Sequence, residues 1–465
     1  MTIKIYNTLT GKKEEFKPLK DKAVSMYVCG ITPYDEAHLG HARAYVTFDI
    51  IRRHLINSGY KVTYVQNFTD IDDKIIKRAN ERKISPRQLA EENIKSYFDQ
   101  MGKLNILPAD KYPRVTESIP EIIEFIKRLI EKKAAYVVNG DVYFSVRSFP
   151  EYGKLSKRNI EDLKSGARVE IGEHKNDPLD FALWKKSKPD EPAEVSFESP
   201  WGKGRPGWHI ECSVMSTTLL GDTIDIHGGG HDLIFPHHEN EIAQTEAGTG
   251  KPFVRYWIHN GFVTINKEKM SKSLGNFFTL KDIFKKFEPR VVRYFLLSLH
   301  YHSPLDFSED RLTEAKNALA GLDNTALKLN AMNANSPKPP SNQELSEKES
   351  KAKADFLDAL DNDFNTELAL SQLHKLKSEM HASSDKAFYG KAYNTIKNLM
   401  EKCLGISLAK IEPVPENVGE LAKQREEFRK QKDWEKADET RKKIEGLGFI
   451  IEDNPCGQPT VYKKS

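Results

Sequence analysis

The stretch from about residue 22 to residue 80 constrains the fold of this 465-residue chain more than any other. It begins with an apolar run, Val24 to Val28, that ends in a turn containing Gly and Pro. Apolar residues then recur at helical spacing, at Tyr45, Phe48, Ile51 and Leu55. A strand that turns directly into a long helix is the first half of a βαβ unit.

A second strand and helix follow at once. Lys61 to Phe68 is predicted to be a strand, Thr69-Asp70 to cap a helix, and Ile71 to Arg82 to form that helix. Alternating strands and helices predict an α/β fold with a parallel sheet, whose chemistry lies at the carboxyl ends of the strands.

Two histidines, His38 and His41, lie at the first strand-to-helix turn, in His38-Leu39-Gly40-His41. Free N–H groups and the helix dipole attract anions there. Lys269 and Lys272 lie far away, among Ser and Gly residues that allow a loop to close. Cationic and N–H donors suit a triphosphate, because cleavage at the α-phosphorus builds charge on the β and γ oxygens. Capping histidines and a solvated lysine turn explain each motif equally well alone, but the pair favours the phosphate role.

A glycine run, Gly228, Gly229 and Gly230, follows the strand-like Thr223 to His227 and precedes His231 and Asp232. A backbone without side chains lets a flat base or a ribose approach closely. A plain tight turn is the alternative interpretation.

Two cysteines lie beside these motifs. Cys29 ends the first strand, and Cys212 lies in Gly-Trp-His-Ile-Glu-Cys, upstream of His237 and Glu241. Two thiolates, an imidazole and a carboxylate can make a tetrahedral zinc site. Their spacing alone is weak evidence, since buried inert cysteines and a capping histidine fit it too.

Composition excludes some classes of protein. No apolar run approaches the ~20 residues that span a bilayer, and the N-terminus lacks the features of a signal peptide, so we expect no membrane association. Four cysteines in so long a chain do not make a disulfide framework, which favours the cytoplasm. The net charge of +3 does not by itself indicate a nucleic-acid binder.

The C-terminal part alternates charges from Arg425 to Lys443, with Trp434 among them. Such a stretch is usually a solvated helical hairpin. Arg and Trp can also stack on unpaired bases, and Asp can accept hydrogen bonds from base amino groups.

Together, the histidine turn and Lys269-Met-Ser-Lys-Ser273 resemble the two signatures of the class I aminoacyl-tRNA synthetases. The residues around them resemble the cysteinyl-tRNA synthetase family over essentially the whole chain. This resemblance implies a Rossmann-like catalytic domain split by an insertion, then a helical bundle and a small anticodon-binding domain. The expected segments are catalytic first half 1–110, insertion 111–200, catalytic second half 201–260, stem-contact region 261–310, helical bundle 311–410 and anticodon-binding domain 411–465.

The resemblance also implies roles for individual residues. His38, His41, Lys269 and Lys272 would act in catalysis, with Lys272 the main transition-state lysine. The expected ATP-binding residues are Gly40, Gly228, Gly229, Gly230, Asp232 and Lys272. One zinc ion per chain would be held by Cys29, Cys212, His237 and Glu241, with His238 as the residue that could be confused with His237. Thr69 and Trp208 would border the amino-acid pocket, and the anticodon contacts would be Arg429, Trp434, Asp438 and Asp453.

The implied reaction joins L-cysteine to tRNA(Cys) through cysteinyl-adenylate, using ATP with Mg²⁺ in a monomeric cytoplasmic enzyme. Zinc binds thiolate strongly and a protonated serine hydroxyl weakly, so it would select the substrate without proofreading. Two alternatives remain: a cysteine ligase that uses an amino-sugar acceptor, and an inert RNA-binding or zinc-scaffold protein.

Overall fold

The computed structural model describes residues 2–159, 175–189, 191–265, 268–269, 277–333, 343–383, 385–409, 414–453 and 459–463. These residues form two compact units. The first comprises residues 1–289, 300–307 and 362–364, and the second comprises 290–299, 308–361 and 365–465. No helix in the described parts of the chain has the length and apolar character needed to cross a bilayer.

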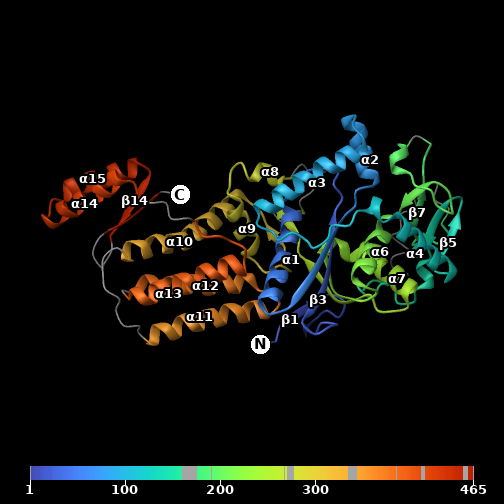
Figure 1. The fold of residues 1–465 in the computed structure, drawn as a ribbon, viewed down its shortest axis with the longest axis horizontal. Helices are drawn as coiled ribbons and strands as arrows, with labels where there is room; N and C mark the ends of the chain where they lie inside the picture. The colour runs from blue at the N-terminus through green and yellow to red at the C-terminus, as the bar shows by residue number, and fades with distance from the viewer. Residues whose placement is uncertain are drawn as a thin grey trace. The chain divides into compact units, whose positions relative to one another are not determined.

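The first unit is built on a four-stranded parallel sheet, which confirms the predicted α/β class (Figure 1). Its strands, in spatial order, are β10 (Val254–Asn260), β9 (Ile224–Gly230), β3 (Ala23–Ile31) and β4 (Lys61–Phe68). The chain runs from β3 to β4 on one side and later enters β9 on the other side of β3. The strand order therefore reverses between β3 and β9, where open α/β sheets bind their ligands.

Helix α1 (Leu39–Asn57) connects the first two strands, and α2 (Asp73–Arg82) and α3 (Pro86–Lys103) follow β4. The prediction that Thr69-Asp70 caps the second helix is wrong. Asp72 is the cap, because its carboxylate accepts from the N–H of Lys74 at 2.8 Å, and the helix begins at Asp73. Asp70 instead accepts hydrogen bonds from the backbone and hydroxyl of Thr116.

The segment expected to be an insertion, 111–200, contains a helix, α4 (Ile119–Glu131), and a hairpin, β5 (Ala135–Val138) with β6 (Asp141–Phe144). Two strands that the sequence did not reveal complete its antiparallel sheet, β7 (Phe181–Lys186) and β8 (Gly204–Pro206). The Pro-, Lys- and Glu-rich stretch from Lys185 to Glu194 has the composition of an exposed segment, but Glu191 within it pairs with Arg205 at 2.6 Å.

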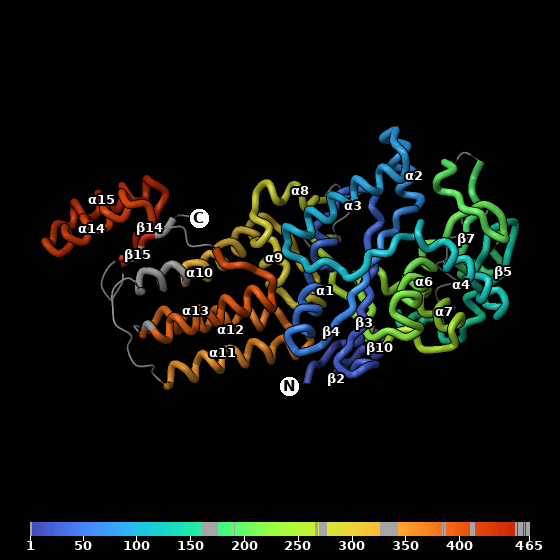
Figure 2. Tube along the Cα trace, in the orientation of Figure 1, coloured from blue at the N-terminus to red at the C-terminus, as the bar shows by residue number. Residues whose placement is uncertain are grey.

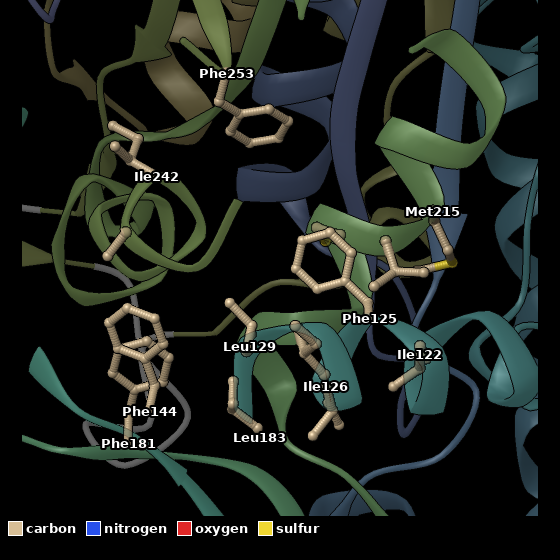
Figure 3. Packing of buried hydrophobic residues seen from close by; sticks show 14 of the residues in the cluster. Ile122, Phe125, Ile126, Leu129, Phe144, Phe181, Leu183, Met215, Ile242 and Phe253 are labelled. Carbon is tan, nitrogen blue, oxygen red and sulfur yellow. The ribbon is translucent and has the colours of Figure 1, made fainter. Parts of the chain in front are cut away.

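One hydrophobic core joins the insertion to the sheet. Figure 3 shows Ile122, Phe125 and Ile126 of α4 beside Met215 of α6 (Trp208–Leu220), and the same cluster includes Tyr27 of β3 and Ile242 of α7 (Glu239–Thr249). Each fully buried side chain of this size contributes about 1.5–3 kcal/mol. The insertion is thus packed into the catalytic unit through a shared core.

Smaller elements complete the first unit: β1 (Lys4–Asn7), β2 (Lys12–Glu15), β11 (Val263–Ile265), β12 (Glu268–Lys269), α8 (Leu280–Ile283) and β13 (Leu305–Asp306), with short turns at Val115–Glu117, Val146–Ser148, Ala193–Val195, His231–Leu233 and Ile234–His238.

The second unit is helical, as predicted, and ends in a pair of helices followed by a two-stranded β-hairpin (Figure 2). Its helices are α9 (Pro289–Leu297, whose first residue belongs to the first unit), α10 (Glu309–Asn333), α11 (Gln343–Asp361), α12 (Thr366–Ala382), α13 (Lys386–Lys402), α14 (Glu416–Lys430) and α15 (Trp434–Gly446), and its strands are β14 (Phe449–Glu452) and β15 (Thr460–Lys463).

Two stretches of the second unit have a composition that indicates a break between helices. In the Asn-, Ser- and Pro-containing stretch 333–346, residues 343–346 belong to α11, while 334–342 lie outside the described residues. In the Pro- and Gly-containing stretch 411–419, residues 416–419 form the start of α14, and 411–413 lie outside the described residues. The charged stretch 425–443 is the helical hairpin α14–α15 that its pattern indicated.

Candidate functional site

The two histidines of the turn after β3 cap helix α1. The Nδ1 atom of His38 accepts from the N–H groups of Gly40 and His41, at 3.1 and 3.3 Å. The Nδ1 atom of His41 accepts in return from the N–H of His38 at 3.3 Å. The two rings stack, with centroids 3.7 Å apart.

These caps set the tautomer of both rings. An imidazole nitrogen that accepts cannot carry the hydrogen, so each neutral ring is protonated on Nε2. The capping interpretation and the phosphate interpretation of the histidines are therefore compatible: Nδ1 holds the helix start, and Nε2 is the donor side. This pair lies at the dipole-positive end of α1, beside the point where the strand order reverses.

The lysine motif is described only in part. The backbone of Lys269 lies in β12, paired with Thr264 of β11, and Lys272 lies outside the described residues. Beyond the motif the chain returns to the histidine turn. The N–H of Leu280 donates to the carbonyl of Ala37 at 3.0 Å, and the Phe277 ring packs edge-on against His38. The segment that follows the motif therefore contacts the histidine turn.

The glycine run lies within β9, and is neither a loop nor a tight turn. A Cβ on Gly228 would lie 2.1 Å from the Phe48 ring of α1, and one on Gly229 would lie 2.7 Å from Leu233. Helix packing therefore requires at least the first glycine. Gly230 precedes the short turn that carries His231 and Asp232, at the carboxyl edge of the sheet.

The four predicted zinc ligands converge at that same edge. Donor atoms of Cys29, Cys212, His237 and Glu241 all lie within 4.8 Å of one another, and all four residues are buried. The two Sγ atoms are 3.7 Å apart, Cys29 Sγ is 3.6 Å from Glu241 Oε1, and that oxygen is 2.9 Å from His237 Nε2. Residues separated by up to 212 positions thus share one small volume.

This geometry fits a zinc ion. Tetrahedral zinc with bonds of about 2.3 Å to sulfur and about 2.0 Å to nitrogen or oxygen separates its ligand atoms by roughly 3.3–3.8 Å. The sulfur–sulfur and sulfur–oxygen separations fall in this range, and the nitrogen–oxygen separation is slightly shorter. Two thiolates also favour zinc over harder cations.

Further histidines, which the sequence did not single out as ligand partners, surround this donor cluster. His209 Nδ1 lies 3.0 Å from His237 Nδ1, and His227 Nε2 lies 2.8 Å from Glu241 Oε2. Metal-binding groups are commonly oriented by such contacts on their remaining polar atoms. His227 adjoins the glycine run and His209 lies three residues before Cys212, so proximity to the motifs was the available signal.

His238, the residue that could be confused with His237, contacts other members of the cluster. Its Nε2 lies 3.3 Å from Cys29 Sγ, and its Nδ1 lies 2.7 Å from His259 Nε2. A second four-donor set, Cys29, His227, His238 and Glu241, is therefore also within metal-binding range. It contains one thiol where the first set contains two.

The pKa values of the residues in the donor cluster depend on one another. Burial raises the pKa of Glu241, but His227 and His237 outweigh it and lower that pKa to about 2. Burial lowers the pKa of His237, yet the Glu241 carboxylate prevails and raises it to about 10. A hydrogen bond from Cys29 lowers the pKa of Cys212 to about 6, while burial raises that of Cys29. One thiolate thus forms readily near neutral pH, as a metal ligand must.

The two predicted pocket residues lie beside the cluster. The Trp208 ring lies over the His237 ring, with centroids 4.3 Å apart, and remains 40% exposed. Buried Thr69 donates to Glu211 at 2.9 Å. Burial raises the pKa of Glu211 well above its ordinary value. Glu211 was not predicted, because nothing in its spacing distinguishes it from a surface glutamate.

The predicted anticodon residues also gather, on the α14–α15 hairpin and at Asp453, which directly follows β14. Arg429 pairs with Asp453 and lies 5.9 Å from the Trp434 ring centroid, while Trp434 is 58% exposed. Asp453, with smaller contributions from other carboxylates including Asp438, raises the pKa of Arg429. Arg425, which the sequence did not single out, is buried and also pairs with Asp453, at 2.8 Å.

Comparison with known proteins places the chain in a family. Residues 15–317 match the family described as tRNA synthetases class I (C) catalytic domain. The cysteine–tRNA ligase of Endomicrobium trichonymphae is 58% identical over 469 residues, covering 100% of both chains. The cysteine–tRNA ligase of Carboxydothermus hydrogenoformans is 52% identical, covering 98% of this chain and 99% of the relative.

Solved structures show the same fold at low sequence identity. Mycobacterium tuberculosis methionyl-tRNA synthetase in complex with methionyl-adenylate matches with a TM-score of 0.60 at 17% identity, over 82% of this chain and 92% of that one. The leucyl enzyme of Agrobacterium radiobacter matches with a TM-score of 0.62 at 11% identity, over 84% and 85%. The matching family model, the full-length relatives and the shared fold together show that the present chain belongs to the cysteine–tRNA ligase family of class I tRNA synthetases.

Proposed function

We propose that the protein ligates L-cysteine to tRNA(Cys) in two steps. The cysteine carboxylate first attacks the α-phosphorus of ATP, forming cysteinyl-adenylate and releasing pyrophosphate. A hydroxyl of the terminal adenosine of the tRNA then attacks the acyl carbon, loses its proton and releases AMP. The observation that carries this proposal is the convergence of two thiols, an imidazole and a carboxylate beside the histidine-capped start of α1.

The chain's own residues supply the first step. Carboxylates are ionised at neutral pH, so the attacking group needs no general base. The Nε2–H groups of His38 and His41, and the lysines of the motif, would stabilise charge on the departing pyrophosphate. Losing one such donor typically raises the barrier by about 2.7–4 kcal/mol. With Mg²⁺ on the phosphates, the β9 edge around Gly230 and Asp232 would receive the adenosine.

Selection of cysteine would take place at the donor cluster. A zinc ion held by Cys29, Cys212, His237 and Glu241 would bind a substrate thiolate far better than a hydroxyl. Cys29 and Glu241 are the members common to both four-donor sets. We assign the two remaining ligand positions to Cys212 and His237, not to His227 and His238, because a set with two thiols favours zinc. The Trp208 ring over His237 would border the substrate side chain.

The test is cysteine-dependent ATP–pyrophosphate exchange on protein whose zinc content is measured. We expect about one zinc per chain and exchange with cysteine but not with serine. An amino-sugar ligase would give the same exchange but transfer cysteine to the sugar, so acceptors must be compared directly. Full-length similarity to relatives, including the hairpin α14–α15, favours the tRNA acceptor. Absence of exchange at full zinc occupancy would contradict the proposal.

A further inference from the structure

A network of alternating charges joins the antiparallel sheet β5–β8 to the start of helix α2. Arg205 of β8 donates to Glu191 at 2.6 Å and to Oδ1 of Asp73, the first residue of α2. Lys185 of β7 donates to the other oxygen, Asp73 Oδ2, at 3.2 Å. The Arg205 and Glu191 side chains are only 5% and 9% exposed. This part of the network is therefore shielded from the solvent screening that weakens exposed ion pairs.

Asp73 also offsets a repulsion within the sheet. Lys185 and Arg205 lie directly opposite each other in the antiparallel pair β7–β8. Like charges in that arrangement destabilise a sheet. The two cations instead reach different oxygens of one carboxylate, which lies between them. The sheet therefore holds the start of α2 in one place.

The same two segments of the chain are joined a second time. Thr69, which lies four residues before Asp73, donates to Glu211 at 2.9 Å. Glu211 lies six residues after Arg205. The two segments are thus in contact at both ends, and these contacts fix the spacing between them.

Trp208 lies between the two contacts, three residues after Arg205. It follows Gly207, whose N–H donates to the carbonyl of Leu183 at 2.9 Å and where a Cβ would clash with the backbone of β7. The strand pair β7–β8 therefore sets where Trp208 begins α6, and the charged network sets where that strand pair lies relative to Thr69. Under the proposed function, Thr69 and Trp208 border the substrate side chain.

The donor cluster alone does not distinguish cysteine from homocysteine. Homocysteine carries the same thiol on a side chain that is longer by one methylene, so a metal ion that binds thiolate can accept both. The walls of a pocket can discriminate one methylene by about 10–200-fold. That discrimination requires walls that do not move apart, so the residues that hold them contribute to specificity.

We propose that Arg205 is a positioning residue, which holds the walls of the amino-acid pocket at a separation that fits cysteine and excludes homocysteine. It acts through Asp73 and does not touch the substrate. The inference rests on the proposed function, since it takes Thr69 and Trp208 as walls of the pocket and zinc as the ligand of the substrate sulfur.

The first test compares Arg205→Met with Arg147→Met in ATP–pyrophosphate exchange with cysteine, homocysteine and serine. Arg147 lies in the turn after β6 and pairs with Asp177 at 2.7 Å, so its variant also removes an ion pair. We expect Arg205→Met to lower the preference for cysteine over homocysteine in kcat/KM about tenfold. Serine should stay rejected and the zinc content unchanged, because the donor cluster is intact. Arg147→Met should keep the wild-type preference.

The second test uses a milder variant. Loss of Arg205 leaves the buried Glu191 carboxylate unpaired, which is costly, whereas the Asp73 side chain is 55% exposed. Asp73→Asn should lower the preference in the same direction, and the double variant Asp73→Asn/Arg205→Met should lower it no further than Arg205→Met, since both changes break one contact. Arg205→Lys keeps the charge without the forked donors and should fall between wild type and Arg205→Met.

The outcomes separate this inference from the function on which it rests. Wild-type protein without cysteine-dependent exchange would reject the proposed function. Normal exchange by the wild type, with equal losses for cysteine and homocysteine in Arg205→Met, would overturn the inference alone by showing a role in folding only. Activation of serine or loss of zinc would also overturn it, because the effect would then lie at the metal.

Additive effects in the double variant would overturn the role of the contact between Arg205 and Asp73. Should Arg205→Met fail to fold, Asp73→Asn decides the matter: a lowered preference supports the inference, and the wild-type preference overturns it.

Discussion

The donor cluster of the first unit and the charged hairpin of the second are both assembled from distant residues, but they are held differently. Around the cluster, Cys29, Cys212, His237 and Glu241 are buried and within reach of one another. On the hairpin, Arg429 pairs with a carboxylate that is 52% exposed, beside a tryptophan that is 58% exposed.

This difference reflects two kinds of recognition. Buried donors at fixed separations can hold a metal ion, and such an ion would bind a thiolate far better than a hydroxyl. An exposed cation beside an aromatic ring can stack on unpaired bases and tolerates small displacements. The comparison therefore predicts sharp losses when the cluster is changed and graded losses when the hairpin is changed.

The largest effect is expected from Cys212→Ser. It removes a thiolate from the donor set, so zinc content and cysteine-dependent exchange should fall by more than the roughly 10–100-fold typical of changes outside a metal's own ligands. Zinc analysis and exchange kinetics measure both. Cys403→Ser, another buried cysteine, is the control and should retain its zinc. Full zinc in Cys212→Ser would favour the alternative donor set that lacks this cysteine.

Lys272→Ala should lower exchange by at least about a hundredfold, since it removes a donor to the departing pyrophosphate. Zinc content and the unfolding transition should not change. This variant sharpens the comparison by separating phosphate chemistry from metal binding. Unchanged exchange would remove Lys272 from the mechanism.

His227→Leu should weaken zinc binding about 10–100-fold, because Glu241 Oε2 loses its 2.8 Å partner. His227→Gln keeps a donor and should recover most of the affinity. Competition with a chelator measures the difference. Equal losses in the two variants would mean that His227 acts through packing instead of through this hydrogen bond.

Trp434→Ala should raise the KM for tRNA in proportion to a loss of about 1–3 kcal/mol of base stacking, with exchange unaffected. Trp434→Phe, which retains a ring, should lose less. An unchanged KM in both variants would indicate that the hairpin is only a solvated surface.

The smallest effect concerns pH. Hydrogen bonds from Arg429 and Arg425 lower the pKa of Asp453 to about 2, so this carboxylate contributes stability above its unfolded pKa near 4 and loses it as the pH falls toward 2. Because the pair is largely exposed, its contribution should be below about 1 kcal/mol. Asp453→Asn should therefore lower the unfolding midpoint slightly at pH 7 and not at all near pH 2. A difference that grows on acidification would contradict this assignment.

The sequence predicted the parallel sheet, the insertion and the helical second unit, because their hydrophobic periodicity is local. It did not predict β7 and β8, whose pairing depends on distant partners, nor Asp72 as the cap of α2. The zinc ligands were inferred from family resemblance. Spacing alone could not bring Cys29 and Cys212 together, since 183 positions separate them. The glycine run was expected after a strand, but its backbone pairs with β10, which makes it part of one.

The central claim is that the donor cluster binds a metal ion which then selects the substrate sulfur. X-ray absorption at the zinc edge, on protein alone and with L-cysteine or L-serine, tests it directly. We predict about two sulfur ligands per zinc in the protein alone and with serine, and three with cysteine. A count that stays at two in all three samples would contradict the account.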